Sequence, residues 1–390
     1  MFSLLLVIIY IAFISLGLPD SILGSAWPSM YEGLQVPVSY VSILSMIISA
    51  GTIVSSMSSG KVLGALGTGK VTAVSVAMTA VALFGFSFSS SFFMLCLWGI
   101  PYGLGAGSVD AALNNYVALH YKSRHMNWLH CFWGVGATVG PYIMGLCLTN
   151  NLKWNRGYQV IGVLQTVLVI GLLFSLPLWK QPEKEGTGRE KRAVSMKFSQ
   201  ILKMKGAKKI LFGFFSYCAV ETTAGLWASS FLVLEKGINA ETAAKWASLF
   251  YLGITGGRFL SGFVADKIGD KNMVRIGQAL CLVSVGLLFV PLGVGFTLGA
   301  LVLLGVGCAP IYPGLIHETP ENFGPEKSQA IMGVQMGCAY IGTTCMPVVF
   351  GAVTNLTGLG LYPVFLLVVL LMMIAVIESL NLEIKKENRL

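Results

Sequence analysis

Three carboxylic acids lie inside long apolar stretches of the sequence, where ionisable residues are rare. They are Asp20, Asp110 and Glu221. A charge at the centre of a bilayer costs from about 2.5 to more than 10 kcal/mol, so such acids are expected to face water-filled cavities. A carboxyl group there can bind and release a proton or another cation. We predict coupling sites at these three positions; the alternative is that each acid only hydrogen-bonds to neighbouring helices and never titrates.

Amides, an imidazole and indoles accompany these acids. Asn114 lies four residues after Asp110, so the two share one helical face. Amides offer donors and acceptors and Trp offers a flat apolar face, which is how sugar rings are commonly held. An unperturbed His titrates near neutrality. The predicted substrate-binding residues are Asn114, Asn127, His130, Trp133, Trp227 and Gln335. The alternatives are packing for His130 and lipid-facing or interfacial anchoring for each Trp.

Basic residues are expected to be absent from the depths of the apolar stretches, with Arg258 nearest, toward the inner end of its stretch. A cavity with carboxylates and no strong cation suits a neutral polyol or a cation rather than an anion. Two hypotheses follow. One is a secondary transporter that imports a neutral sugar or polyol with protons or sodium. The other is an exporter that exchanges cationic or amphiphilic compounds for protons.

An intramembrane enzyme or a receptor that no longer transports is the remaining alternative. No nucleophile is paired with a base at usable spacing, and neither GxSxG nor HExxH occurs. The segment from Gly64 to Lys70 resembles a phosphate loop, but Val71 stands where Ser or Thr is needed and no buried strand precedes it. We therefore predict no enzymatic activity, no cofactor and no metal.

The elements that position these residues follow from composition. The chain has 390 residues, of which 55% are hydrophobic and 11% are charged, whereas soluble proteins carry about 25% charged residues. Apolar runs of about 20 residues span a bilayer as helices. We predict an all-α membrane protein with twelve transmembrane helices, near residues 4–28, 38–59, 71–89, 92–118, 127–149, 157–179, 209–234, 241–264, 273–290, 293–316, 327–352 and 361–382.

A polar, basic stretch divides these helices into two sets of six. The predicted domains are a bundle over 1–179, a cytoplasmic linker over 180–208 with a short surface helix at 199–204, and a bundle over 209–390. With both termini in the cytoplasm, the basic residues outside are only Lys153, Arg156, Lys236 and Lys245. The positive-inside rule thus explains the net charge of +9 without nucleic acid. We expect a monomer in a bacterial inner (plasma) membrane.

The two sets of helices repeat each other. The segment 60–67 recurs at 262–269, and Gly136-xxxx-Pro141 recurs as Gly342-xxxx-Pro347. Two six-helix halves in parallel repeat resemble the major facilitator superfamily, whose substrate sites lie near the bilayer midplane and which transports by rocking its halves. Residues 262–271 resemble its cytoplasmic loop motif. The predicted conformational latch comprises Gly262, Asp266, Lys267 and Lys271; the alternative is an ordinary basic turn.

Several motifs together resemble one branch, the fucose–galactose–glucose:proton symporters and their sodium-dependent glucose transporter-like relatives. They are Gly17-Leu18-Pro19-Asp20, Gly105-xxxx-Asp110-xxx-Asn114, Asn127 with His130, Glu221 with Trp227, and Ala309-Pro310-Ile311-Tyr312-Pro313. The resemblance implies that Asp20 couples protons and that Asp110 serves substrate and coupling. It also implies that Asn114 and Asn127 bind substrate. His130 and Trp133 stand where Gln and Asn are expected, which argues against fucose itself but not against a polyol.

Overall fold

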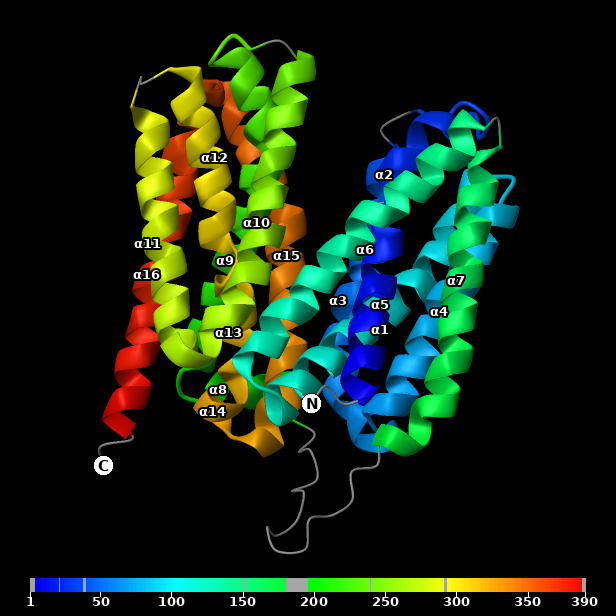
Figure 1. Cartoon of the computed structure of the whole chain (residues 1–390), viewed down its shortest axis with the longest axis horizontal. Helices are drawn as coiled ribbons and strands as arrows, with labels where there is room; N and C mark the ends of the chain where they lie inside the picture. The colour runs from blue at the N-terminus through cyan, green and yellow to red at the C-terminus, as the bar shows by residue number, and fades with distance from the viewer. Residues whose placement is uncertain are drawn as a thin grey trace, which may run out of the picture. The chain divides into compact units, whose positions relative to one another are not determined.

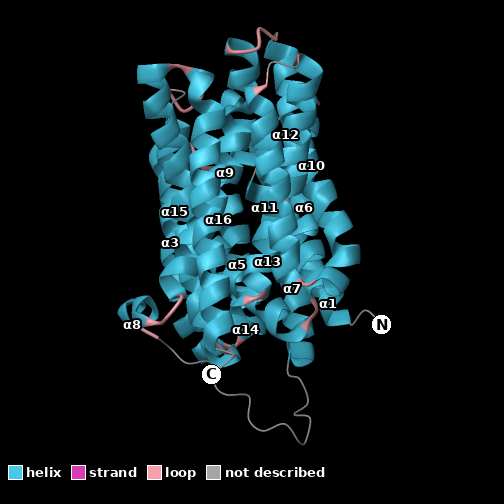
Figure 2. Ribbon diagram, turned by 90° about the vertical axis from the view of Figure 1, so that its left-hand side faces the viewer, coloured by secondary structure: helices cyan, strands magenta, loops and turns pink. Residues whose placement is uncertain are grey.

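The computed structural model describes residues 4–20, 22–37, 40–150, 152–179, 196–238, 240–290 and 293–387. Within these ranges the chain forms helices joined by turns and loops, with no β-strand (Figure 2). Residues 180–195, most of the predicted linker, lie outside the described part. The predicted surface helix beyond them is confirmed as α8 (Phe198–Lys203).

The chain forms two compact units. Unit 1 comprises Met1–Tyr116, Leu129–Met196 and Pro325–Gly337, and unit 2 comprises Val117–Trp128, Lys197–Gly324 and Cys338–Leu390. Each unit therefore contains one short segment from the other half of the sequence. These two segments are nearly equivalent under the 206-residue offset of the sequence repeat, so the exchange itself follows the repeat.

Apart from the first part of α15 (Pro325–Thr357), which is orange, the helices of unit 1 run from blue to green in Figure 1. They are α1 (Leu4–Asp20), α2 (Ile22–Ala26), the 3-10 turn η1 (Trp27–Ser29), α3 (Val41–Leu66), α4 (Thr68–Phe88), most of α5 (Phe92–His120) and of α6 (Ser123–Thr149), α7 (Trp154–Ser175) and η3 (Leu176–Trp179). A core of buried side chains, among them Trp27, Phe86 and Tyr158, binds them together. Burial of each such aromatic ring contributes about 1.5–3 kcal/mol.

The helices of unit 2 run from green to red in Figure 1. They are α8, α9 (Ala207–Leu234), α10 (Ala240–Ile268), α11 (Asp270–Phe289), α12 (Val294–Cys308), α13 (Ile311–His317), α14 (Thr319–Phe323), the later part of α15 (Pro325–Thr357), η4 (Leu359–Leu361) and α16 (Tyr362–Glu387). The tenth predicted helix is broken at Ala309–Pro310, because proline has no N–H to continue the hydrogen-bond ladder.

Eleven helical segments of the described part are long and apolar enough to cross a membrane. The twelfth predicted span, α10, has the length, but Arg258 and several small residues make it less apolar. Some helices also extend past the predicted spans. The helix α3 continues to Leu66 rather than residue 59, since backbone hydrogen bonding can continue beyond the hydrocarbon.

The sequence repeat has a structural counterpart in two turns. Gly67 separates α3 from α4, and Gly269 separates α10 from α11. Their φ, ψ values are 76°, 159° and 81°, 150°. Only glycine adopts this region readily. The repeat therefore preserves a backbone conformation as well as a sequence.

Candidate functional site

Asp20 lines a cavity of about 250 Å³ inside unit 1. The other polar groups on its wall are those of Ser45, Ser49, Tyr102 and Tyr158. Asp20 is the last residue of α1, and its side chain is exposed to this space. Since none of the described residues that line the cavity is basic, the carboxyl group faces it without a cationic neighbour.

Two aromatic side chains hold this carboxyl group. The Tyr102 hydroxyl donates to Oδ1 over 3.3 Å, and the Trp133 indole Nε1 donates to Oδ2 over 3.0 Å. Both oxygens therefore accept a hydrogen bond when Asp20 is ionised. The predicted substrate residue Trp133 thus lies beside the predicted coupling residue Asp20. A change in the protonation of Asp20 would therefore also change the hydrogen bond of Trp133.

Pro19 explains a second polar cluster behind Asp20. Because proline has no N–H, the carbonyl group of Ser15 loses its normal helical donor. Gln165 of α7 replaces it, with Nε2 2.6 Å from the Ser15 oxygen, while its own Oε1 accepts the Thr79 hydroxyl over 2.9 Å. Gln165 is 1% exposed. The proline-disturbed end of α1 is therefore stabilised by α7 and α4 rather than left open.

Asp110 lies deeper along α5. It is 5% exposed, and Asn114 donates from Nδ2 to its Oδ1 over 2.8 Å. The Asn114 Oδ1 atom is 3.0 Å from Nε2 of His130, so that nitrogen must carry the hydrogen. The structure brings these three predicted residues together. Asp110 lies eight residues after Tyr102, a rise of about 12 Å along α5, so its cluster is separate from the contact of Tyr102 with Asp20.

Close packing of α1 against α6 sets the position of Trp133. A Cβ atom added to Gly136 would lie 2.0 Å from the Ile14 carbonyl oxygen, and one added to Gly140 would lie 2.0 Å from that of Leu18. Small residues of this kind let membrane helices approach closely. The glycine of the Gly136-xxxx-Pro141 motif therefore acts by allowing contact with the helix that carries Asp20.

The two remaining predicted amides lie in different units. Asn127, in unit 2, is 2% exposed; its Nδ2 donates to the Ser123 carbonyl group over 3.1 Å, and its Oδ1 accepts no hydrogen bond within the described part. Gln335, in unit 1, is fully buried on α15, six residues beyond Gln329, which donates to Ser59 over 3.2 Å.

Glu221 has a basic partner, which corrects one sequence-based expectation. Arg258 of α10 is 4% exposed, and its Nη2 lies 3.6 Å from Oε1 of Glu221 on α9. The expectation that no basic group accompanies the deep acids is therefore wrong in unit 2. Arg258 lay ten residues before the end of its helix, and its position in the sequence did not show that it would turn inward.

Substituting Glu221 tests the strength of this pair. We expect Glu221→Gln to destabilise the protein by about 2 kcal/mol, because it leaves the buried Arg258 charge uncompensated. The loss is smaller than for a fully buried pair because Glu221 is partly exposed. The double variant Glu221→Gln/Arg258→Met should recover most of that loss. Unfolding in detergent measures both, and a double variant that is less stable than Glu221→Gln would contradict the pairing.

Trp227 is held by α15. Its indole Nε1 donates to the Pro347 carbonyl group over 3.1 Å, and its ring lies edge-on to Phe350 with 5.3 Å between centroids. Both contacts are made by α15, and the hydrogen bond is to the proline of the Gly342-xxxx-Pro347 motif. The N–H group of Trp227 is therefore engaged by protein before any substrate binds.

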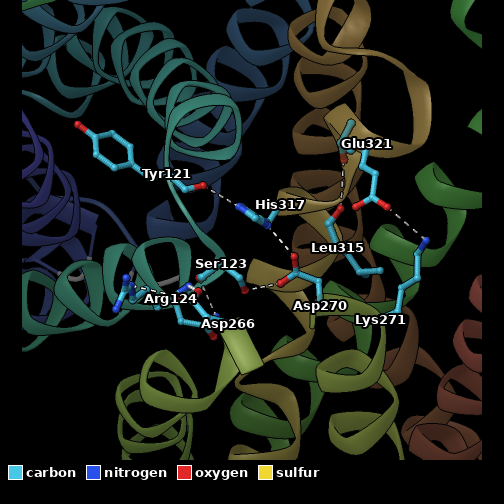
Figure 3. Close-up of polar contacts among 11 residues, drawn as sticks. Tyr121, Ser123, Arg124, Asp266, Asp270, Lys271, Leu315, His317 and Glu321 are labelled. Carbon is cyan, nitrogen blue, oxygen red and sulfur yellow. Dashed lines mark hydrogen bonds and ion pairs between the residues drawn. The ribbon is translucent and has the colours of Figure 1, made fainter. Parts of the chain in front are cut away.

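One predicted latch residue, Asp266, contacts the first turn of α6, in unit 2 (Figure 3). Asp266 accepts the backbone N–H of Arg124 over 3.1 Å and pairs with its guanidinium over 3.0 Å. The first N–H groups of a helix lack internal partners and favour an anion, so Asp266 stabilises this helix end. Gly262 allows contact with Trp128, whose indole nitrogen would lie 2.0 Å from an added Cβ.

The two predicted basic latch residues differ. Lys267 is exposed, whereas Lys271 lies 3.9 Å from Glu321. A group that was not predicted adjoins them: Asp270 accepts the hydroxyl of Ser123 and lies 2.6 Å from His317. Asp270 stands within the loop motif that pointed to Asp266, so that motif could have indicated it; Tyr102 had no comparable signal.

Comparison with known proteins gives three kinds of match. The model of the Major Facilitator Superfamily matches residues 9–245 and 210–384. Bypass of stop codon protein 6 of Saccharomyces cerevisiae is 21% identical over 90% of this chain and 77% of its own length, and the glucose/mannose transporter GlcP of Bacillus subtilis is 21% identical over 78% and 77%. The crystal structure of the transporter FucP in the outward conformation superimposes with a TM-score of 0.77 at 15% identity, covering 97% of this chain and 98% of FucP.

Proposed function

Since this chain belongs to the Major Facilitator Superfamily, we propose that it imports a neutral sugar or polyol together with a proton. Membership makes it a multi-pass membrane transporter of a small molecule rather than an enzyme, and the predicted all-α fold of the superfamily is confirmed. The proposal is carried by one observation. Asp20 lines a cavity of about 250 Å³ whose described walls carry hydroxyl groups and no basic residue.

Protonation of Asp20 can be linked to sugar binding through its two donors. The ionised carboxylate accepts hydrogen bonds from both Tyr102 and Trp133. Protonation removes the charge and weakens these bonds. The hydroxyl and indole groups then become available to a sugar hydroxyl, with the Trp133 face as an apolar platform. Proton and substrate would therefore favour each other's binding.

A proton suits this site better than sodium. A sodium ion needs several oxygen ligands, and a carbonyl group released by Pro19 would be an obvious one. The Ser15 carbonyl group instead accepts a hydrogen bond from Gln165 over 2.6 Å, and Ser15 is not among the described residues that line the Asp20 cavity. GlcP, whose name gives glucose and mannose as its substrates, supports a hexose as the first sugar to test.

The other predicted residues have roles within the same proposal. Asp110, Asn114 and His130 form a second coupling and binding group in unit 1, while Asn127 and Gln335 offer buried amides. The Asp266 contacts with Arg124 serve as a latch that forms and breaks during alternating access. We place both termini in the cytoplasm and the protein, as a monomer, in a plasma membrane.

Ligand binding to the purified protein tests the substrate class. We expect a neutral hexose to raise the melting temperature. Its binding should add roughly 1.4 kcal/mol to the free energy of unfolding for each tenfold excess of hexose over its Kd. The effect should persist without sodium. Stabilisation by cationic amphiphiles and by no sugar would contradict the proposal and favour the proton-exchanging exporter.

A carboxylated sugar or another organic acid is the second candidate, and Arg258 favours it. Its guanidinium is buried beside Glu221, and its Nε donates to no acceptor in the described part of the chain. If Glu221 were protonated, Arg258 would be free to bind a carboxylate. Stabilisation by glucuronate but not by glucose, stronger at low pH and lost in Arg258→Gln, would establish this candidate over the neutral sugar.

A further inference from the structure

His317 has a hydrogen-bond acceptor at each ring nitrogen. It is the last residue of α13, in unit 2. Its Nδ1 lies 2.6 Å from the carboxylate Oδ2 of Asp270, and its Nε2 lies 2.9 Å from the carbonyl oxygen of Tyr121 (Figure 3). Tyr121 belongs to the short connection between α5 and α6, and Asp270 begins α11. One imidazole ring thus joins three segments of the chain.

The number of protons follows from these partners. A neutral imidazole has one N–H and one bare nitrogen. A carbonyl oxygen can only accept, so Nε2 must carry a hydrogen. A second proton must then lie between Nδ1 and Asp270, because otherwise two lone pairs would face each other across 2.6 Å. The pair binds this proton in either form, as imidazolium with carboxylate or as imidazole with carboxylic acid.

We propose that His317 and Asp270 form a proton-binding site that docks the α5–α6 connection onto α11 and α13. The remaining Asp270 oxygen accepts the hydroxyl of Ser123, the first residue of α6. With the proton bound, the cluster of His317, Asp270 and the Tyr121 carbonyl group is neutral and fully hydrogen-bonded. Without it, a net negative charge remains and the imidazole loses one of its two contacts.

The neighbouring charged groups leave His317 as the group that balances the charge of Asp270. Arg124 is paired with Asp266 over 3.0 Å, and Lys271 faces Glu321 over 3.9 Å. Glu318, next in sequence, is 5% exposed and adds an acid rather than a base. On the α6 side, the connection carries Lys122, and the ring of His125 lies against Tyr121 and Trp128 with centroids 5.6 and 5.7 Å apart; of these groups only His317 lies within 2.6 Å of Asp270. His317 is therefore the group placed to balance Asp270.

A consequence for pH follows from the proton count. The docked arrangement binds one more proton than the undocked one, so docking is favoured as pH falls and weakened as it rises, by up to about tenfold per pH unit. A role for this site in transport rests on the function proposed above, to which it would add a proton site apart from Asp20 and Asp110. The proton site itself does not depend on any substrate.

Nitrogen NMR of the full chain labelled with 15N-histidine tests the site directly. The chain has four histidines, so the spectrum is simple, and His317→Gln assigns the signal. We expect one histidine at neutral pH with both ring nitrogens protonated, or with Nδ1 sharing its proton with Asp270. This signal should disappear in His317→Gln. A wild-type His317 with an ordinary bare nitrogen at neutral pH would overturn the proposal, whatever the protein transports.

Hydrogen exchange tests the docking. The Arg124 N–H donates to Asp266, so peptides over residues 119–130 report whether the connection is docked. After correction for intrinsic exchange, we expect protection to rise up to tenfold per pH unit on acidification in the wild type. The exposed neighbour His120→Gln should behave like the wild type, and His317→Gln should show no such pH dependence. A dependence that survives in His317→Gln would overturn the assignment.

Discussion

Asp20→Asn is expected to abolish uphill accumulation of substrate while leaving exchange of substrate across the membrane. An amide keeps the shape of the side chain but cannot bind and release a proton. With one proton per substrate and a pH difference of two units, the wild type can accumulate up to about 100-fold, since each tenfold ratio corresponds to about 1.4 kcal/mol. The variant should stop at equal concentrations. Uptake of labelled hexose into proteoliposomes measures both.

Glu32→Gln is the matched control for this experiment. Glu32 is an exposed acid of the same unit, and its contact is with its neighbour Tyr31, whose hydroxyl donates to it over 3.0 Å. Glu32→Gln removes one carboxylate, as Asp20→Asn does, but leaves the cavity unchanged. Accumulation by this variant should therefore match that of the wild type. If the Asp20→Asn variant accumulated substrate to the same level as the Glu32→Gln variant, Asp20 would have no role in coupling.

Gly140→Ala is expected to produce the largest loss of stability. Its new methyl group would lie 2.0 Å from the Leu18 carbonyl oxygen, which belongs to a helix backbone and cannot rotate away. Separating α1 from α6 to relieve the clash would cost more than about 3 kcal/mol, the upper end for overpacking. It would also displace Trp133 from Asp20. The free energy of unfolding in detergent, or the yield of folded protein, measures this loss.

Gly145→Ala, on the same helix, provides the comparison. A Cβ atom added there meets no atom within 4 Å. Alanine favours a helix over glycine by up to about 1 kcal/mol, so this variant should be neutral or slightly stabilised. If both substitutions had the same effect, general helix propensity rather than the α1–α6 contact would govern stability.

The fold was predictable because membrane helices depend on few sequence features. Runs of apolar residues predicted the helices, and the recurring glycine and proline motifs predicted the repeat. Boundaries were less accurate, because α3 continues past its apolar run and Pro310 breaks the tenth predicted helix. The exchange of short segments between the units had no sequence signal, since it depends on packing.

The candidate site was predictable in its residue types rather than its partners. The cost of burying charge singled out Asp20 and Glu221, and helical spacing linked Asp110 to Asn114. Which tyrosine would face Asp20 depends on helix rotation, which residue spacing alone does not determine. Arg258 was treated as lying near the membrane surface, whereas its position in three dimensions places it beside Glu221. Gln165 was not among the predicted residues, although a lone amide in an apolar run needs a buried partner.

Coupling of a neutral sugar to a proton through Asp20 can be measured as proton movement driven by the sugar. Proteoliposomes without an initial pH gradient, in sodium-free buffer, should take up protons when a transported hexose is added outside. A pH-sensitive dye inside them should report acidification, and Asp20→Asn should abolish it. Hexose entry with no acidification, or protons leaving in exchange for an added cation, would show that this protein is not a sugar–proton symporter.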